Sequence, residues 1–262
     1  ALNTLKIKGK LLYDQGDIQA AHDIYLSVLD TREIPWAILG YCRCLVDLGQ
    51  FEEATKKLEA LIQINEHYIE CYDVLANIYY QQNQTTKSQE ILERATQISP
   101  KAILRQANLC HIALENKDWS VATKAGSKSA QLSKNSCHAS SDIHINYVKA
   151  LQDTLKNGTY RDKLIANTDV EKSLQTLKKD YAHNKSVQMH RLLLESETCI
   201  HQKKTRQAAE AFEQAKTLHQ QLDGEELSEE STQLFEEQLA SLSTAMNIPL
   251  ATESAKTDTS TA

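Results

Sequence analysis

The sequence predicts an all-α protein, an α-solenoid in which antiparallel helix pairs follow one another along the chain. Only 7 Gly and 3 Pro stand among the 262 residues, too few for the frequent turns of a β-rich or alternating β/α fold. Apolar residues recur at spacings of three and four, which is the period of an amphipathic helix. The third observation is an internal repeat.

A helix-ending turn recurs at Gly16, Gly49, Asn83 and Lys117, at intervals of 33, 34 and 34 residues. This interval is that of the tetratricopeptide repeat, whose unit is two helices joined by a turn. Small residues stand seven before and five after the turns, at Gly9, Cys42, Ala76 and Cys110, then at Ala21, Ala54, Ser88 and Ala122. Nine residues after the turns stand Tyr25, Leu58, Leu92 and Gly126. These recurring positions predict four repeats within residues 2–136.

Residues 137–222 predict two further, divergent repeats. The first helix of repeat five ends at Asn157-Gly158, and residues 159–167 are expected to be an insertion before its second helix. That helix is expected to begin at a capping box of Thr168 and Glu171, whose side chains satisfy free amides at a helix start. In repeat six the matching positions are Leu192, Ser196 and Cys199, then Ala208, Phe212 and Ala215.

Helix stops and the end of the chain complete this frame. Pro35 and Pro100 are expected just past second helices, because Pro cannot continue a helix. Residues 223–246 predict a capping helix, since acidic residues at its start suit the positive end of the helix dipole and a stack needs a solvent-facing end. Residues 247–262 are rich in Thr, Ser and Ala and predict a disordered tail.

Composition excludes several classes of function. The 29 Lys+Arg and 35 Asp+Glu give a net charge of -6, the opposite of the basic face that nucleic-acid binding requires. No apolar run approaches the roughly 18 to 20 residues of a membrane span, and the first residues do not have the pattern expected of a signal peptide. We therefore expect a cytoplasmic protein that binds neither nucleic acid nor membrane. Six Cys permit disulfides, but their scattered spacing favours reduced thiols.

No motif predicts catalysis. Cys199 with His201, and His138 with His144, do not match a zinc-ligand spacing. The chain has no Gly-rich phosphate loop and no recognisable nucleophile motif. We expect no enzymatic activity, no cofactor and no metal.

Binding is expected along the first helices, because stacked helix pairs curve and present a concave groove lined by the first helix of each pair. The repeat frame projects the following residues into it: Lys6, Lys10, Tyr13 and Asp14 in repeat one, Arg43 and Asp47 in repeat two, Asp73, Asn77, Tyr80 and Gln81 in repeat three, Asn108, His111 and Glu115 in repeat four, and Lys149 and Gln152 in repeat five. The alternative for each residue is a solvated helix face. A clamp for a C-terminal carboxylate, as in tetratricopeptide co-chaperones, is not expected, because Lys10 and Gly40 stand where those clamps use Asn.

Residues 35–40, 71–76, 98–100 with 104–106, and 135–138 resemble the repeat half of bacterial response regulators that join a CheY-like receiver to tetratricopeptide repeats. The similarity spans roughly residues 5–155. It implies a two-component signalling protein in which phosphorylation of a receiver in cis alters what the repeats bind, with a sensor kinase or another response regulator as partner. No receiver pattern occurs in these 262 residues, so the resemblance places that domain outside them.

Two other settings stay open: a stand-alone assembly scaffold, and a regulatory region fused to an enzyme domain outside this chain. A homodimer is a further alternative, formed by a basic strip against the acidic final helix. That strip contains Lys117, Lys124, Lys128 and Lys134. Its simpler interpretation is a solvated helix face.

Overall fold

The computed structural model describes residues 2–134 and 136–222, together with residues 236, 240, 243 and 244. Within them the regular structure is twelve α-helices and no strand, which confirms the predicted all-α solenoid of six helix pairs. The chain divides into two compact units, residues 1–138 (unit 1) and residues 139–262 (unit 2). The predicted capping helix and tail lie outside the continuously described residues.

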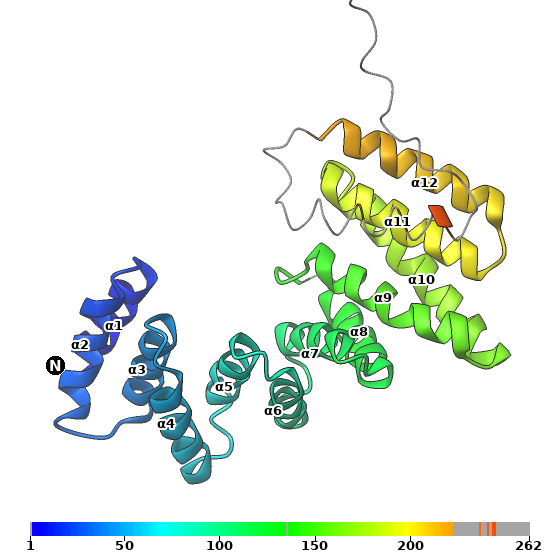
Figure 1. Ribbon diagram of the computed structural model, residues 1–262. Coiled ribbons are helices and arrows are strands. Elements are labelled where there is room, and N and C mark those ends of the chain that lie inside the picture. Colours follow the sequence, from blue (N-terminus) through cyan, green and yellow to red (C-terminus); the bar gives the residue numbers. More distant parts are fainter. Residues whose placement is uncertain (1, 135, 223–235, 237–239, 241–242, 245–262) are drawn as a thin grey trace, which may run out of the picture. The chain divides into compact units, whose positions relative to one another are not determined.

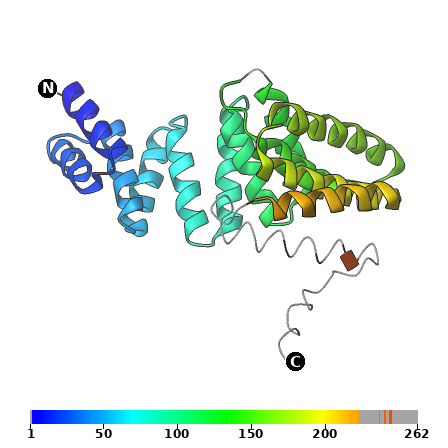
Figure 2. The same ribbon diagram turned by 90° about the horizontal axis from the view of Figure 1, so that it is seen from above.

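Unit 1 contains four helix pairs. They are α1 (Leu2–Asp14) with α2 (Ile18–Leu29), α3 (Pro35–Asp47) with α4 (Phe51–Ile64), α5 (Glu70–Gln81) with α6 (Thr85–Ile98), and α7 (Ile103–Glu115) with α8 (Trp119–Ser133). The helices of a pair pack together, and α2 packs on α3, α4 on α5 and α6 on α7. Figures 1 and 2 show the same succession from two sides, with α1 at one end of the unit. The second helices α2, α4 and α6 therefore each cover one face of the first helix that follows.

The predicted turns of unit 1 each contain one left-handed residue. The backbone angle φ is 83° at Gly16, 75° at Gly49 and 58° at both Asn83 and Lys117. The amide of the following residue bonds the carbonyl five residues back, as from Asp118 to Ala113 at 2.8 Å. This is the Schellman motif, which satisfies carbonyl groups left free at a helix end. The sequence interval is thus the interval between chain reversals.

The predicted small residues lie buried where the two helices of a pair meet. Ala21, Ala54 and Ala122 have no exposed surface. In two of the helix pairs a side chain also forms a hydrogen bond across this contact. The Cys42 thiol donates to the Ala54 carbonyl at 3.7 Å, and the Ser88 hydroxyl donates to the Ala76 carbonyl at 2.9 Å. Small side chains here allow the close approach that lets such bonds form.

The buried ring of Tyr25 explains two glycines. A Cβ atom on Gly40 would lie 2.4 Å from Tyr25 Cζ, and one on Gly9 would lie 2.9 Å from it. The ring also meets Trp36 edge-on, with 6.3 Å between ring centroids. The absence of side chains at these positions on α1 and α3 therefore makes the space for this one aromatic group.

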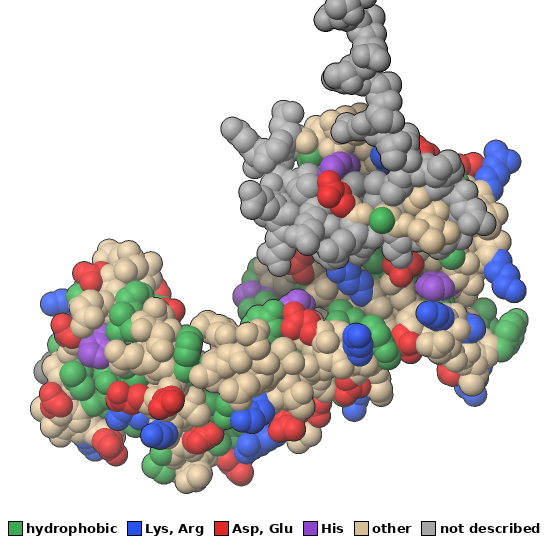
Figure 3. Space-filling model, in the orientation of Figure 1, with side chains coloured by type: hydrophobic (Ala, Val, Ile, Leu, Met, Phe, Trp, Pro, Cys, Tyr) green, Lys and Arg blue, Asp and Glu red, His purple; other side chains and the backbone are tan. Residues whose placement is uncertain are grey.

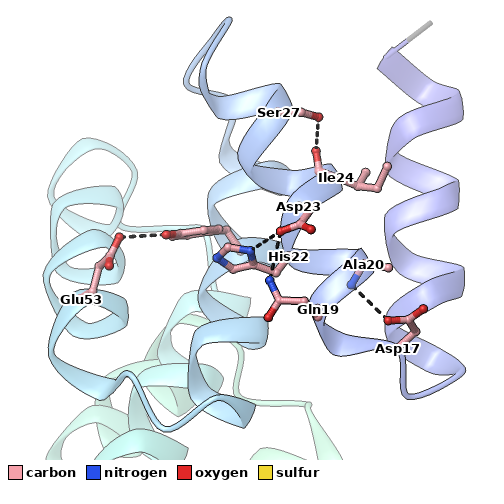
Figure 4. A network of polar contacts seen from close by, with 9 residues as sticks. Asp17, Gln19, Ala20, His22, Asp23, Ile24, Ser27 and Glu53 are labelled. Atoms are coloured by element: carbon pink, nitrogen blue, oxygen red, sulfur yellow. Dashed lines mark hydrogen bonds and ion pairs between the residues drawn. The ribbon is translucent and has the colours of Figure 1, made fainter.

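A polar network, shown in Figure 4, joins α2 to the next pair. Asp17 caps α2 by accepting from the Ala20 amide at 3.1 Å. His22 lies 3.0 Å from Asp23, and its ring lies 5.0 Å from that of Tyr41 on α3. The Tyr41 hydroxyl donates to Glu53 of α4 at 3.0 Å. Hydrogen bonds from His22 and Gln19 lower the pKa of Asp23.

The two prolines differ in role. Pro100 follows α6, as predicted. Pro35 was expected to mark the end of α2 but instead forms the first residue of α3, a position where its missing amide is not needed.

All six cysteines are free, as expected. Cys42, Cys44, Cys71 and Cys110 are buried on the first helices of unit 1. Burial raises the pKa of the Cys42, Cys71 and Cys110 thiols to about 12. These groups act as small core side chains, not as nucleophiles.

Unit 2 contains α9 (Ser141–Asn157), α10 (Tyr160–Asp180), α11 (Lys185–His201) and α12 (Thr205–Gln220). The pair of α11 and α12 keeps the repeat frame. The Ser196 hydroxyl donates to the Ala208 carbonyl at 2.8 Å, the same contact that Ser88 and Ala76 make. Its turn has a left-handed residue too, Lys203 with φ of 60°.

The predicted start of the second helix of repeat five is wrong. The capping box lies at Thr159 and Asp162, and α10 runs for 21 residues from Tyr160. Residues 159–167 therefore extend the helix by about two turns. Thr168 lies inside it, and its hydroxyl bonds the Leu164 carbonyl at 3.1 Å. Residues 160–167 contain no Gly or Pro, so a helix that begins at the first capping sequence can run through the second.

The interior of α10 carries an apolar stripe, in which Val170, Leu174 and Leu177 are buried. The loop before it differs from the other turns inside pairs. Gly158 is extended, with φ of -69° and ψ of 166°. None of the described helices combines the length and apolar character needed to cross a lipid bilayer.

Candidate functional site on the first helices of unit 1

The candidate site is the set of predicted side chains on α1, α3, α5 and α7, which we term the first-helix face. It consists of Lys6, Lys10, Tyr13, Arg43, Asp47, Asp73, Asn77, Tyr80, Asn108 and His111. Most of these side chains are exposed or half-buried, and Tyr13 and Asp73 belong to the half-buried ones. The packing explains why: one side of each first helix meets its own second helix, and another meets a neighbouring pair.

Between α5 and α7 the face carries an ordered network. Arg105 donates to both carboxylate oxygens of Asp73, at 2.7 and 2.8 Å. Such a two-point contact fixes geometry as well as charge. Sequence reasoning missed Arg105, although it follows Asp73 by 32 residues, close to the repeat interval.

The other end of α5 is joined to α7 by Tyr80. Its hydroxyl donates to Glu115 at 2.9 Å, and its ring meets His111 edge-on, with 6.1 Å between centroids. His111 in turn lies 3.4 Å from Glu115. These contacts hold one aromatic side chain in a defined place on an exposed surface.

Between α1 and α3 the face is aromatic and cationic. Burial, together with the nearby Asp47 carboxylate, raises the pKa of Tyr13 to about 12. The Lys6 ammonium lies over the Trp36 ring, 5.8 Å from its centroid, a favourable cation–π arrangement. Burial raises the pKa of Tyr68 as well, and the positive charge of Arg43 opposes part of the shift in both tyrosines.

Lys10, Arg43, Asn77 and Asn108 are among the exposed groups of the face whose side chains make no hydrogen bond or ion pair in the described part of the chain. Their amides and cations can offer hydrogen bonds to a ligand backbone or to carboxylates. The fixed aromatic rings beside them supply apolar contact area.

Two predicted residues do not belong to this set. Lys149 and Gln152 lie half-buried on α9, in unit 2. The pKa of Lys149 is lowered, because burial outweighs the opposing effect of the Glu197 and Asp142 carboxylates. The side chains around Lys149 therefore belong to unit 2.

Two hollows lie elsewhere on the described surface, and sequence reasoning did not find them. One, of about 680 Å³, lies at the tips of the second and third pairs and is lined by Gly49, Gln50, Phe51, Glu52, Glu53, Lys56 and Gln82. The other, of about 520 Å³, lies in unit 2 beside α11 and α12. Neither is lined by residues of the first-helix face.

Charge gives the surface no single sign. Acidic and basic side chains are interspersed over unit 1 in the view of Figure 3. Within the described residues no three His, Cys, Asp or Glu side chains gather as metal ligands would.

The fold defines a class: unit 1 has the fold of a tetratricopeptide-repeat solenoid, and unit 2 contains two further helix pairs. A family model described as tetratricopeptide repeat matches residues 45–111. None of the curated proteins matches the sequence.

Solved structures share this fold at low sequence identity. The repeat protein YrrB, described as having an unusual peptide-binding site, is 10% identical over 74% of this chain and 91% of its own, with a TM-score of 0.58. A tetratricopeptide repeat protein from Parabacteroides merdae is 11% identical over 92% and 98%, with a TM-score of 0.54. MamA is 16% identical over 66% and 96%, with a TM-score of 0.53.

Proposed function

We propose that unit 1 is a protein-interaction module that binds an extended peptide segment of a partner protein on its first-helix face. The proposal rests on one observation. Along this face, side chains that are fixed by neighbouring residues stand beside exposed side chains that can contact a ligand. Tyr80 is held by the Glu115 carboxylate, and Tyr13 is half-buried near Asp47. Arg43, Asn77 and Asn108 are available to a ligand.

The chemistry of these groups favours a peptide. Asparagine amides can both donate to and accept from a peptide backbone without regard to its sequence. Ordered aromatic rings are common anchors at protein interfaces because little entropy is lost when they are covered. YrrB, which shares the fold and is described as having a peptide-binding site, supports the same class of ligand.

The binding mode involves no bond-making step. A partner would bind and leave reversibly, and its specificity would follow from side chains that meet Arg43, Lys10 and the acidic network of α5 and α7. We therefore propose a non-catalytic, cytoplasmic role.

The experiment that tests this proposal is selection of peptides from a random library on the intact chain. Peptides so isolated should bind at least about tenfold more weakly to a variant carrying Asn77→Ala and Asn108→Ala, a loss of about 1.4 kcal/mol. Gln97→Ala, an exposed change on the second helix α6, is the matched control and should leave the affinity unchanged. Equal affinity for all three proteins would reject the first-helix face as the site.

For the cellular setting, the resemblance to receiver-linked response regulators supports a two-component pathway, with a receiver in cis and a sensor kinase or another response regulator as partner. Addition of the purified chain to a kinase–receiver pair should then change the rate of phosphate transfer. An unchanged rate would favour the stand-alone scaffold instead.

A further inference from the structure

The face of α1 that carries Ile7 and Leu11 is the counterpart of a buried surface in the other first helices. Leu11, Cys44, Ile78 and Ile112 are spaced by 33, 34 and 34 residues, the interval of the turns. Cys44 and Ile78 have no exposed surface and Ile112 has 5%, whereas Leu11 is 54% exposed. One turn earlier, Gly40 of α3 and Val74 of α5 are buried, whereas the equivalent Ile7 is 69% exposed and the equivalent Asn108 of α7 is exposed too.

The coverage of α3, α5 and α7 explains this contrast. Each receives the second helix of the preceding pair: α2 on α3, α4 on α5 and α6 on α7. Between α4 and α5, for example, Leu61 and Ile62 share one apolar cluster with Val74 and Ile78. Among the described helices only α2 and α3 pack on α1, and both leave Ile7 and Leu11 exposed.

The shape of this face of α1 indicates which kind of partner would fit on it. Residues four apart on a helix form one continuous stripe, and in the equivalent contacts that stripe meets another helix. A helix with its own apolar stripe is therefore the complementary shape, as in other helix-to-helix docking.

The charged residues beside the stripe indicate which charges the partner should carry. Lys8 and Lys10 flank the stripe on its two sides, both are exposed, and no hydrogen bond or ion pair within the described residues involves either one. Asp14 is the one acidic residue in α1. Two α1 helices brought face to face would place these cations together, so charge opposes a second copy as the occupant.

We propose that this face of α1 is a second docking site, which takes an amphipathic helix of a partner protein whose apolar stripe is flanked by Asp or Glu. The bound helix lies on α1 as α2 lies on α3. Burial of Ile7 and Leu11 supplies the affinity, while Lys8 and Lys10 select the acidic flanks. The site shares Lys10 with the first-helix face, but its apolar residues Ile7 and Leu11 are not part of that face, and the proposal does not depend on the function proposed for it.

The test uses the intact chain and two synthetic helical peptides with the same Leu stripe, one flanked by Glu and the other by Lys. Fluorescence anisotropy should show that the Glu peptide binds at least about tenfold more tightly than the Lys peptide. Ile7→Ser combined with Leu11→Ser should weaken binding of the Glu peptide by at least about tenfold. Leu104→Ser, which removes another exposed leucine from α7, is the matched control and should not.

Two results would overturn the proposal. One is equal affinity of both peptides, or of the double variant and wild type. The other is a dimer in sedimentation that the double variant abolishes, which would make a second copy the occupant. The Asn77→Ala and Asn108→Ala variant should bind the Glu peptide normally, so failure of this site and failure of the first-helix face are distinguishable.

Discussion

At the scale of single residues, backbone conformation and burial decide what each position tolerates. The turn residues of unit 1 are all left-handed, yet only two of the four are glycine. Asparagine accepts this conformation more readily than lysine does. Lys117 therefore holds the least suitable side chain of the four.

Lys117→Gly should stabilise the chain by about 0.5–1 kcal/mol, because it removes the steric cost of a left-handed lysine. The measurement is denaturant unfolding monitored by circular dichroism. Lys124→Gly, in the exposed interior of α8, is the control and should instead cost about 1 kcal/mol. Destabilisation by both changes would contradict the assigned turn geometry.

The cysteines give a second prediction at this scale. A thiol reagent at pH 8 should modify exposed Cys137 first and half-buried Cys199 more slowly, and it should reach the four buried thiols only on unfolding. Cys137→Ser should remove the fast phase. Rapid reaction of four or more thiols in the folded chain would show that the predicted core is wrong.

The same burial sets the response to alkaline pH. Cys42, Cys71 and Cys110 have folded pKa values of about 12, raised from 9.0. The folded chain therefore holds these protons more tightly than the unfolded chain does. Their contribution to stability is complete below pH 9 and falls as the pH rises from 9 to 12.

At the scale of helices, the repeat frame made most elements of unit 1 predictable. Turn spacing and the small residues at Ala21, Ala54 and Ala122 locate each helix pair, because close packing admits few other side chains. The start of α10 was not predictable in this way. Thr159 and Thr168 each precede an acidic residue by three, and local sequence does not rank two equivalent caps.

Substitution of the two threonines separates these alternatives. Thr159→Ala should destabilise unit 2 by about 0.5–2 kcal/mol through loss of the cap. Thr168→Ala should be neutral or slightly stabilising, since Thr168 lies inside the helix and alanine favours helix. Thermal unfolding of both variants checks this, and a larger loss for Thr168→Ala would place the helix start where the sequence first indicated.

At the scale of the whole molecule, the residues of the first-helix face could be projected from the sequence, but their contacts could not. The repeat frame gives the direction of a side chain on its own helix. The pairing of Asp73 with Arg105 and of Tyr80 with Glu115 depends on how far apart α5 and α7 lie, which is set by packing. The exposure of Ile7 and Leu11 likewise emerges only when each first helix is compared with its covered equivalents.

The proposed partner peptide binds on the first helices of unit 1 and not on the second helices. Photo-crosslinking tests it directly, with p-benzoylphenylalanine placed at Asn77 in one protein and at Gln97 in another, each mixed with a library-selected peptide. Crosslinking should be strong from position 77 and absent from position 97, since these lie on α5 and α6 respectively. Crosslinking from position 97 alone would contradict the account.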